Sequence, residues 1–183
     1  MDSADLEALI GPPRGQPPPV RWRELEAELG LTFPAEHKEL CAKYPTLHFD
    51  GFLTWFNPGM WPDPMVAAQG MNDVLKGLRK RTSRSPEVVV IDDLGQTSYQ
   101  PRFPIYPEPG GVLQWGNTYN GDKCMWLTNP DPNKWTIMIF RGLWWHYESG
   151  LLDFLIGTLQ GRVRCPLFPE GWPSSLRVEE IYK

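Results

Sequence analysis

Residues 110–159 carry the clearest structural signal in the chain and read GGVLQWGNTYNGDKCMWLTNPDPNKWTIMIFRGLWWHYESGLLDFLIGTL. Short aromatic-rich runs alternate there with turn signals, which are Asn120-Gly121, NPDPNK (129–134) and Arg141-Gly142. Such punctuation is typical of antiparallel hairpins. We therefore predict strands at 112–116, 122–128, 135–140 and 143–148, and then a helix over 151–159 that covers the sheet.

Two short helices are predicted upstream of this segment. In VRWRELEAELGL (20–31) the apolar residues recur at helical spacing, and Gly30 supplies a stop signal. PAEHKELCAKY (34–44) predicts the second helix, with Thr32 as its N-cap. A tight turn should join the two helices and make them antiparallel neighbours.

The middle of the chain predicts strands on either side of a longer helix. HFDGFLTWF (48–56) is expected to form a strand with a turn or bulge at Asp50-Gly51, and VVVI (88–91) another strand. An edge strand is expected near residues 102–105. The intervening helix, MVAAQGMNDVLKGLRKR (65–81), should direct one apolar face inward, made of Val66, Met71, Val74, Leu75 and Leu78.

The composition is that of a single soluble domain. The chain has 183 residues, a formal net charge of −4 and a pI near 5.4, whereas nucleic-acid binding usually needs a basic footprint. No apolar run approaches the about 18 residues of a membrane span. The acidic start MDSADLEALI also lacks the features of a signal peptide. We expect a cytoplasmic protein that binds neither nucleic acid directly nor a membrane.

The cysteines and histidines give no sign of a metal site. Cys41, Cys124 and Cys165 are odd in number and widely spaced, which argues against both a disulfide framework and a zinc site. None of the three histidines stands at metal-ligand spacing from another histidine or from a cysteine. We expect three reduced, mostly buried thiols. His37 is expected at the surface because its neighbours in the helix are polar.

No catalytic motif stands out. A nucleophile elbow, a Walker loop and a dinucleotide fingerprint are all missing from the sequence, so we predict no catalytic residue and no cofactor. Asp92-Asp93 could bind a cation or act as an acid/base pair. However, adjacent strand residues point to opposite faces, and DDLG (92–95) also suits an ordinary turn. The basic run KGLRKRTSR (76–84) could grip nucleic acid, but cations are also favourable at a helix C-terminus. We favour the turn and the helix end.

Five of the nine tryptophans fall within residues 110–159, which raises the idea of a glycan-binding platform. Trp126 and Trp135 belong to runs that are otherwise aliphatic, so we expect at least some of these indoles in the core. Trp144 and Trp145 must face opposite sides of a strand. One of them should be core and the other exposed or covered by a helix. An exposed indole would make a good protein-interface anchor.

Several motifs in the second half of the chain match one family. A WG-T-x-NGD turn is formed by Trp115, Gly116, Thr118, Asn120, Gly121 and Asp122. A W-L-T strand (126–128), a D-P-x-x-W turn (131–135) and an F-L-x-G-x-L helix (154–159) follow it. Upstream, LGLTFPAEHKELCAKYP (29–45) looks like an L-x-x-P helix start. In these features the chain resembles the SUKH superfamily, which includes a fungal cell-wall-synthesis regulator and many bacterial immunity proteins.

The resemblance implies a single α+β domain with a curved antiparallel β-sheet flanked by helices, covering residues 20–168. A Pro-rich linker in residues 1–19 would precede the domain, and residues 169–183 would form a C-terminal extension. The resemblance also implies a non-enzymatic role, in which the protein binds and neutralises a cognate toxin such as a nuclease or another polymorphic effector. The family has no catalytic residues to transfer, and its binding surface differs between members.

Three hypotheses about function remain open at this point. The first is a protein-binding module, most readily an immunity protein. The second is a glycan or small-molecule binding module that uses exposed tryptophans, and the third is a hydrolase that uses Asp92 or Asp93. In the first, acidic groups would steer a cationic toxin surface and an aromatic anchor would slow dissociation. Candidate contacts, chosen for charge or expected exposure, are Asp92, Asp93, Glu108, Asp122, Trp144 and Glu148.

Overall fold

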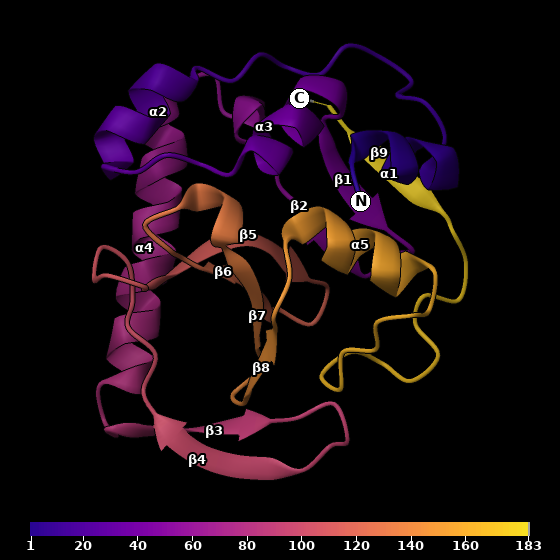
Figure 1. Cartoon of the computed structure of the whole chain (residues 1–183). Helices are drawn as coiled ribbons and strands as arrows, with labels where there is room; N and C mark the ends of the chain where they lie inside the picture. The colour runs from indigo at the N-terminus through magenta and orange to yellow at the C-terminus, as the bar shows by residue number, and fades with distance from the viewer. Residues whose placement is uncertain (183) are drawn as a thin grey trace.

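The computed structural model describes residues 1–182, and one open, curved sheet organises them (Figure 1). The sheet has nine strands in the order β4-β3-β8-β7-β6-β5-β2-β1-β9. Neighbouring strands are antiparallel except for β3 and β8, which are parallel. With five α-helices packed around this sheet, the α+β class expected from the sequence is confirmed.

The elements have the following bounds. The α-helices are α1 (Ser3–Ile10), α2 (Trp22–Leu29), α3 (Ala35–Lys43), α4 (Pro64–Thr82) and α5 (Leu151–Leu159). The strands are β1 (Thr46–Phe49), β2 (Leu53–Trp55), β3 (Glu87–Ile91), β4 (Thr97–Pro101), β5 (Val112–Thr118), β6 (Lys123–Leu127), β7 (Thr136–Phe140), β8 (Trp144–Tyr147) and β9 (Val178–Ile181). Two single turns of 3₁₀ helix are η1 (Pro58–Met60) and η2 (Pro132–Lys134).

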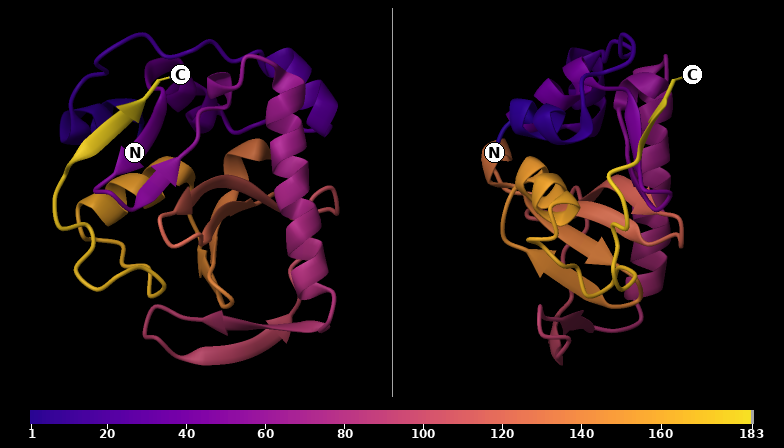
Figure 2. Two further views of the ribbon diagram at one scale, coloured as in Figure 1. Left: turned by 180° about the vertical axis from the view of Figure 1, so that it is seen from behind. Right: turned by 90° about the vertical axis from the view of Figure 1, so that its right-hand side faces the viewer.

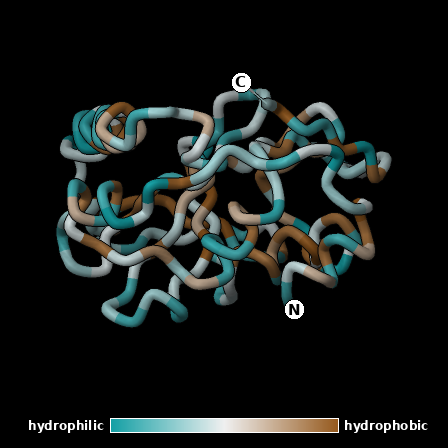
Figure 3. The backbone as a smooth tube through the Cα atoms, turned by 90° about the horizontal axis from the view of Figure 1, so that it is seen from above, coloured by the Kyte–Doolittle hydropathy of each residue, from teal (hydrophilic) through white to brown (hydrophobic). Residues whose placement is uncertain are grey.

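Helices cover both sides of the sheet. α4 lies on one side and packs against α2 and β5, whereas α5 lies on the other side and packs against α1, α3 and β7 (Figure 2). Hydrophobic and hydrophilic residues alternate along the helices in Figure 3, as expected for helices with one buried face. The middle of the sheet is therefore shielded from water on both faces.

Aromatic side chains fill much of the core. Trp55, Trp115, Trp126, Trp144 and Trp145 are among the largest fully buried side chains. Phe154 of α5 packs against Trp115 and Trp145, with ring centroids 5.8 and 6.1 Å apart. Burial of each large apolar side chain contributes about 1.5–3 kcal/mol. The indoles of residues 110–159 thus stabilise the sheet and fix α5 on it.

The strands and the helix predicted for residues 110–159 are confirmed as β5 to β8 and α5. Asp50-Gly51 forms the β1–β2 turn, with φ angles of 45° and 65° that place both residues in the left-handed region. The three cysteines are free and buried, as expected. Among residues 1–182, no helix combines the length and the apolar character needed to cross a membrane.

Three local predictions are wrong. Thr32 does not cap α3, because Pro34 keeps Phe33 out of the helical region and is itself the N-cap. Residues 102–105 form no strand, since Pro104 has no N–H to donate and only Ile105 makes an isolated bridge, to Val112. Val66 is 53% exposed, because it lies one residue outside the α4 stripe that buries Ala67, Ala68, Leu75 and Leu78.

The two segments outside residues 20–168 pack on the domain and on each other. The backbone N–H of Arg14, in the Pro-rich segment, donates to Glu180 (3.0 Å), and the Tyr44 hydroxyl donates to the Gly11 carbonyl (2.7 Å). β9 extends the sheet by pairing along the whole of β1. The C-terminal extension thus contributes an edge strand, and the predicted limits at residues 20 and 168 remain a prediction.

Candidate functional site

A hairpin at one end of the sheet stands apart from the rest of the fold. It consists of β3, the 92–96 turn and β4, and we call it the edge hairpin (residues 87–101). Its pairing to the remaining sheet is a single parallel residue pair, Val90 with Trp144. All five residues of β4 are exposed, and Figure 1 shows the hairpin projecting from the body of the protein. Such a segment is accessible to a partner.

The turn of the edge hairpin uses both of its aspartates. Oδ1 of Asp92 accepts the backbone N–H groups of Leu94 (2.9 Å) and Gln96 (2.8 Å), which confirms the turn expected for DDLG. Oδ1 of Asp93 accepts the indole N–H of Trp145 (2.8 Å). The two carboxylates therefore bind different donors and do not face each other as an acid/base pair would.

Two further carboxylates lie on neighbouring elements, Glu148 just after β8 and Asp153 in α5. β3 and β8 are parallel and pair at Val90 and Trp144. Asp92 and Asp93 therefore follow β3 at the same end of the sheet at which Glu148 follows β8. We call Asp92, Asp93, Glu148 and Asp153 the acidic end.

Asp153, in α5, is the member of the acidic end that sequence reasoning missed. The Tyr147 hydroxyl donates to its carboxylate (2.5 Å). This bond lowers the pKa of Asp153, while burial and the Asp153 carboxylate raise the pKa of Tyr147 to about 12. The carboxylate therefore stays charged, and the nearby Arg162 guanidinium partly balances its charge.

The outer side of β4 presents unpaired backbone groups. Hydrogen-bonded and non-hydrogen-bonded residue pairs alternate along the β3–β4 ladder, and two bonds at its ends show which pairs are bonded. These bonds run from Asp92 N to the Gln96 carbonyl (2.9 Å) and from Arg102 N to the Pro86 carbonyl (2.9 Å). Residues 98 and 100 therefore bond to β3, and the N–H groups of Thr97 and Tyr99 point away from it. A partner strand could therefore bond to the N–H groups of Thr97 and Tyr99. The next outward position, Pro101, has no N–H to donate.

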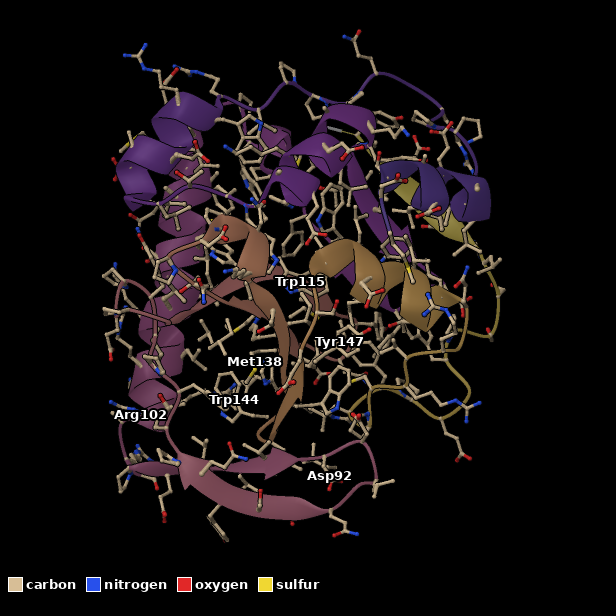
Figure 4. All side chains as sticks on the ribbon, in the orientation of Figure 1. Asp92, Arg102, Trp115, Met138, Trp144 and Tyr147 are labelled. Carbon is tan, nitrogen blue, oxygen red and sulfur yellow. The ribbon has the colours of Figure 1, made fainter. Side chains whose placement is uncertain are left out.

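Side chains reinforce the edge hairpin as a surface for binding. Tyr99 is 76% exposed, and Leu94 at the turn is also exposed. Figure 4 places Asp92, in the turn, and Arg102, just after β4, at opposite ends of the hairpin. The exposed Glu87 lies at the Arg102 end, where it pairs with Pro101. An extended segment laid along β4 would meet the exposed side chains of Tyr99 and Leu94.

The other predicted contacts lie elsewhere. Glu108 is exposed in the loop before β5, where it lines a surface hollow of 830 Å³ between that loop and α2. Asp122 is only 5% exposed, because Oδ2 accepts the Thr118 hydroxyl (2.7 Å) and Arg141 lies 3.7 Å from Oδ1. Its expected exposure is wrong, and its carboxylate shapes the β5–β6 turn.

Trp144 is not an exposed anchor either. It is 2% exposed, with its ring packed against Phe103 and Phe140 at centroid distances of 5.3 and 4.6 Å. Among the five tryptophans of residues 110–159 none is more than 4% exposed. The platform of exposed indoles expected for glycan binding is therefore not formed by this segment.

His37 is buried, contrary to the surface position expected for it, and only 1% of it is exposed. Its Nδ1 accepts the Trp55 indole N–H (3.3 Å), and its Nε2 lies 3.7 Å from Sγ of Cys41. Burial lowers the pKa of His37 to about 3 and raises the pKa of Cys41 well above its usual value. A nucleophilic Cys–His pair needs a thiolate, so this neutral pair suits packing instead.

No family model, curated protein or solved structure matches the chain. The edge hairpin and the acidic end therefore stand on their geometry. In residues 1–182, no group of three or more His, Cys, Asp and Glu side chains could hold a metal ion. At the end of α4, Arg79 donates to the carbonyl of Tyr106, which supports the interpretation of the basic run as a helix end.

Proposed function

We propose that the chain is a non-enzymatic protein-binding module whose partner adds an extended segment to β4. The observation that carries this proposal is the open, fully exposed β4 strand, with outward N–H groups at Thr97 and Tyr99. Exposed sheet edges bind peptide segments through main-chain hydrogen bonds, and neighbouring side chains supply the specificity. The opposite edge strand, β9, is partly covered because Arg14 N donates to Glu180.

The charge of the acidic end selects the kind of partner. Three of its four carboxylates, those of Asp92, Asp93 and Glu148, are exposed. Carboxylates beside a docking edge speed the encounter with a cationic surface. We infer a partner protein that carries basic residues next to an extended segment. Tyr99 would supply the aromatic anchor that was expected, from sequence, of Trp144.

The biological role that we propose is immunity against a cognate toxin. The WG-T-x-NGD turn and the F-L-x-G-x-L helix resemble the SUKH superfamily, and bacterial members of that family commonly neutralise toxins. A basic nuclease is one toxin class with the charge that the acidic end would attract. The hydrolase alternative has less support, because Asp92 holds the turn and Asp93 holds Trp145.

The test uses the products of the genes that neighbour the gene for this chain. Each candidate toxin is co-expressed with the chain, cell growth is scored, and binding is measured by titration calorimetry. The wild-type chain should restore growth with one of them. Thr97→Pro should weaken that complex by at least about tenfold, since it removes an outward N–H and blocks the edge.

Two control variants make the result specific to the edge. Gln100→Ala changes an exposed side chain of the same strand and should bind as the wild type does. Ser98→Pro removes an N–H that bonds to β3, so it should also lower the thermal midpoint, whereas Thr97→Pro should not. Protection against no neighbouring toxin would reject the immunity role. Unchanged binding by Thr97→Pro would reject the edge as the docking site.

A further inference from the structure

A cavity of 250 Å³ lies between α4 and the sheet, away from the edge hairpin. Its apolar wall includes Trp61, Met71, Val74, Trp115 and Trp126. Small-molecule sites are usually concave and mostly apolar, with a few polar groups that orient the ligand. An apolar cavity of about 150 Å³ already admits benzene, so this space suits a ligand with one aromatic ring and a short side group.

One part of the cavity wall is polar and positively charged. Asn117 and Lys123 face each other in the β5–β6 register, and both line the cavity together with Gln114. No ion pair within residues 1–182 involves Lys123. An ammonium group beside an amide is suited to a carboxylate.

Two buried hydrogen-bond donors in the cavity wall lack partners. Within the described part of the chain, Nε1 of Trp115 and Nε1 of Trp126 are enclosed and have no acceptor. Buried polar groups nearly always have a partner, and exceptions often mark a ligand or water position. Both Nε1 atoms are enclosed, so a ligand in the cavity could accept from them only if the indole side chains rotated. For this reason we do not place the ligand's carboxylate on the indole N–H groups. We place the carboxylate on Lys123 and the ring of the ligand against the indole rings.

The space continues along α4 into a neighbouring hollow of 440 Å³, which shares Val74 and Lys123 with the cavity. That hollow adds one charge of each sign, Asp73 and Arg81, so the charge without an opposite partner in its lining is that of Lys123. Gly70 of α4 lines the cavity, and a Cβ at this position would meet no atom within 4 Å. The exposed Gly70 therefore leaves this part of the cavity wall without a side chain.

We propose that this cavity binds a small aromatic carboxylic acid. Its ring lies among Trp61, Met71 and Trp126, and its carboxylate lies on Lys123 and Asn117. A neutral apolar ligand would leave Lys123 unused, and a small inorganic anion would leave the aromatic wall unused. The proposal rests on the cavity alone and is independent of the edge hairpin.

Three probes of related shape test the proposal on the full chain. Phenylacetate carries both the ring and the charge, phenylacetamide carries the ring without the charge, and acetate carries the charge without the ring. Titration calorimetry should show binding of phenylacetate and at least about tenfold weaker binding of the other two. The indole N–H resonances of Trp115 and Trp126 should shift with phenylacetate in NMR spectra.

Matched variants locate the site. Lys123→Met keeps the length of the side chain without its charge and should weaken phenylacetate binding at least about tenfold. Gly70→Leu should fill the cavity and abolish binding without lowering the thermal midpoint, since leucine favours a helix more than glycine does. Lys76→Met, on the exposed face of α4, should bind like the wild type. Absence of phenylacetate binding, equal binding of acetate, or unchanged binding by Lys123→Met would each overturn the proposal.

Discussion

His37 is enclosed by aromatic side chains, and this burial disfavours the charged form of its imidazole. The rings of Trp22, Phe33, Trp55 and Trp126 have centroids 5.7, 5.5, 5.6 and 4.8 Å from the imidazole. Because Trp55 donates to Nδ1, the imidazole proton lies on Nε2, beside Cys41. The neutral ring thus satisfies two neighbours, whereas an imidazolium would lose water and repel the Trp55 N–H.

This enclosure makes the stability of the protein dependent on pH. His37 takes up a proton near pH 6.5 in the unfolded chain but only near pH 3 in the folded protein. Between these values the unfolded state binds more protons, so the free energy of unfolding falls as pH decreases, by up to about 1.4 kcal/mol per pH unit. Urea unfolding of His37→Gln at pH 4 to 7 should show a smaller slope. His48→Gln, which keeps His37, should retain it.

The burial of His37 had a signal in the sequence, whereas its partners did not. His37, Leu40, Cys41 and Tyr44 recur at i, i+3, i+4 and i+7, so the histidine shares the apolar face of α3. The polar residues next to it in sequence, Glu36 and Lys38, favoured the wrong prediction of a surface position. The burial of Trp144 had no such signal, because part of its cover is Phe103, which comes from a loop that no periodicity predicts.

At the scale of elements, α5 depends on a residue of another helix for its start. Its N-cap, Gly150, has no side chain, and the carboxylate of Glu36 in α3 accepts the N–H groups of Leu151 (2.6 Å) and Leu152 (3.3 Å). Burial raises the pKa of Glu36, partly offset by these two bonds. One carboxylate therefore caps α5 and joins it to α3.

Removal of this cap should be costly, and the cost should depend on charge. Glu36→Ala should lower the free energy of unfolding by about 1–2 kcal/mol, because both N–H groups lose their acceptor. Glu36→Gln keeps one acceptor oxygen and should lose less. Since the folded pKa of Glu36 is raised, its contribution declines as pH rises through that pKa, so the deficit of Glu36→Gln should shrink at higher pH. Urea unfolding at pH 5 and pH 8 checks both expectations, and an equal loss in the two variants would contradict them.

The elements that sequence predicts best here are those with two independent signals. β5 to β8 combine apolar runs with turn residues such as Asn120-Gly121 and Arg141-Gly142, and all four were found. β4 has only the turn signal of DDLG (92–95) before it, because TSYQP is exposed throughout and no apolar alternation marks it. The edge strand was expected instead at 102–105, where Phe103 and Ile105 alternate. The strand that matters most for the proposed function was thus the hardest to predict.

At the scale of the molecule, the C-terminal segment is fastened by one turn residue. Oδ2 of Asp50 accepts the backbone N–H (2.7 Å) and the hydroxyl (2.9 Å) of Ser174, and Oδ1 accepts the hydroxyl of Ser175 (2.6 Å). β9 follows these serines and pairs with β1. The sequence predicted only a C-terminal extension here, because no local pattern indicates that β9 pairs with a strand so distant in the chain.

Release of this fastening should expose the segment to proteolysis. Asp50→Gly removes the carboxylate but tolerates the φ angle of 45°, so the β1–β2 turn should persist. Trypsin should then cleave after Arg177 several times faster than in the wild type, as followed by mass spectrometry. Asp92→Gly, which alters the turn of the edge hairpin, should leave that cleavage rate unchanged. Equal rates for Asp50→Gly and the wild type would show that the Asp50 carboxylate does not hold the segment in place.

The three enclosed thiols give the protein internal reporters of its own motions. Cys41 lies in the helical layer, Cys124 in the middle of the sheet and Cys165 in the segment after α5. Burial raises the pKa of each thiol, so an alkylating reagent must wait until that region opens. The three alkylation rates therefore rank the opening of three regions in one unmodified sample. A bound partner or ligand would reveal which region it holds shut by slowing only that rate.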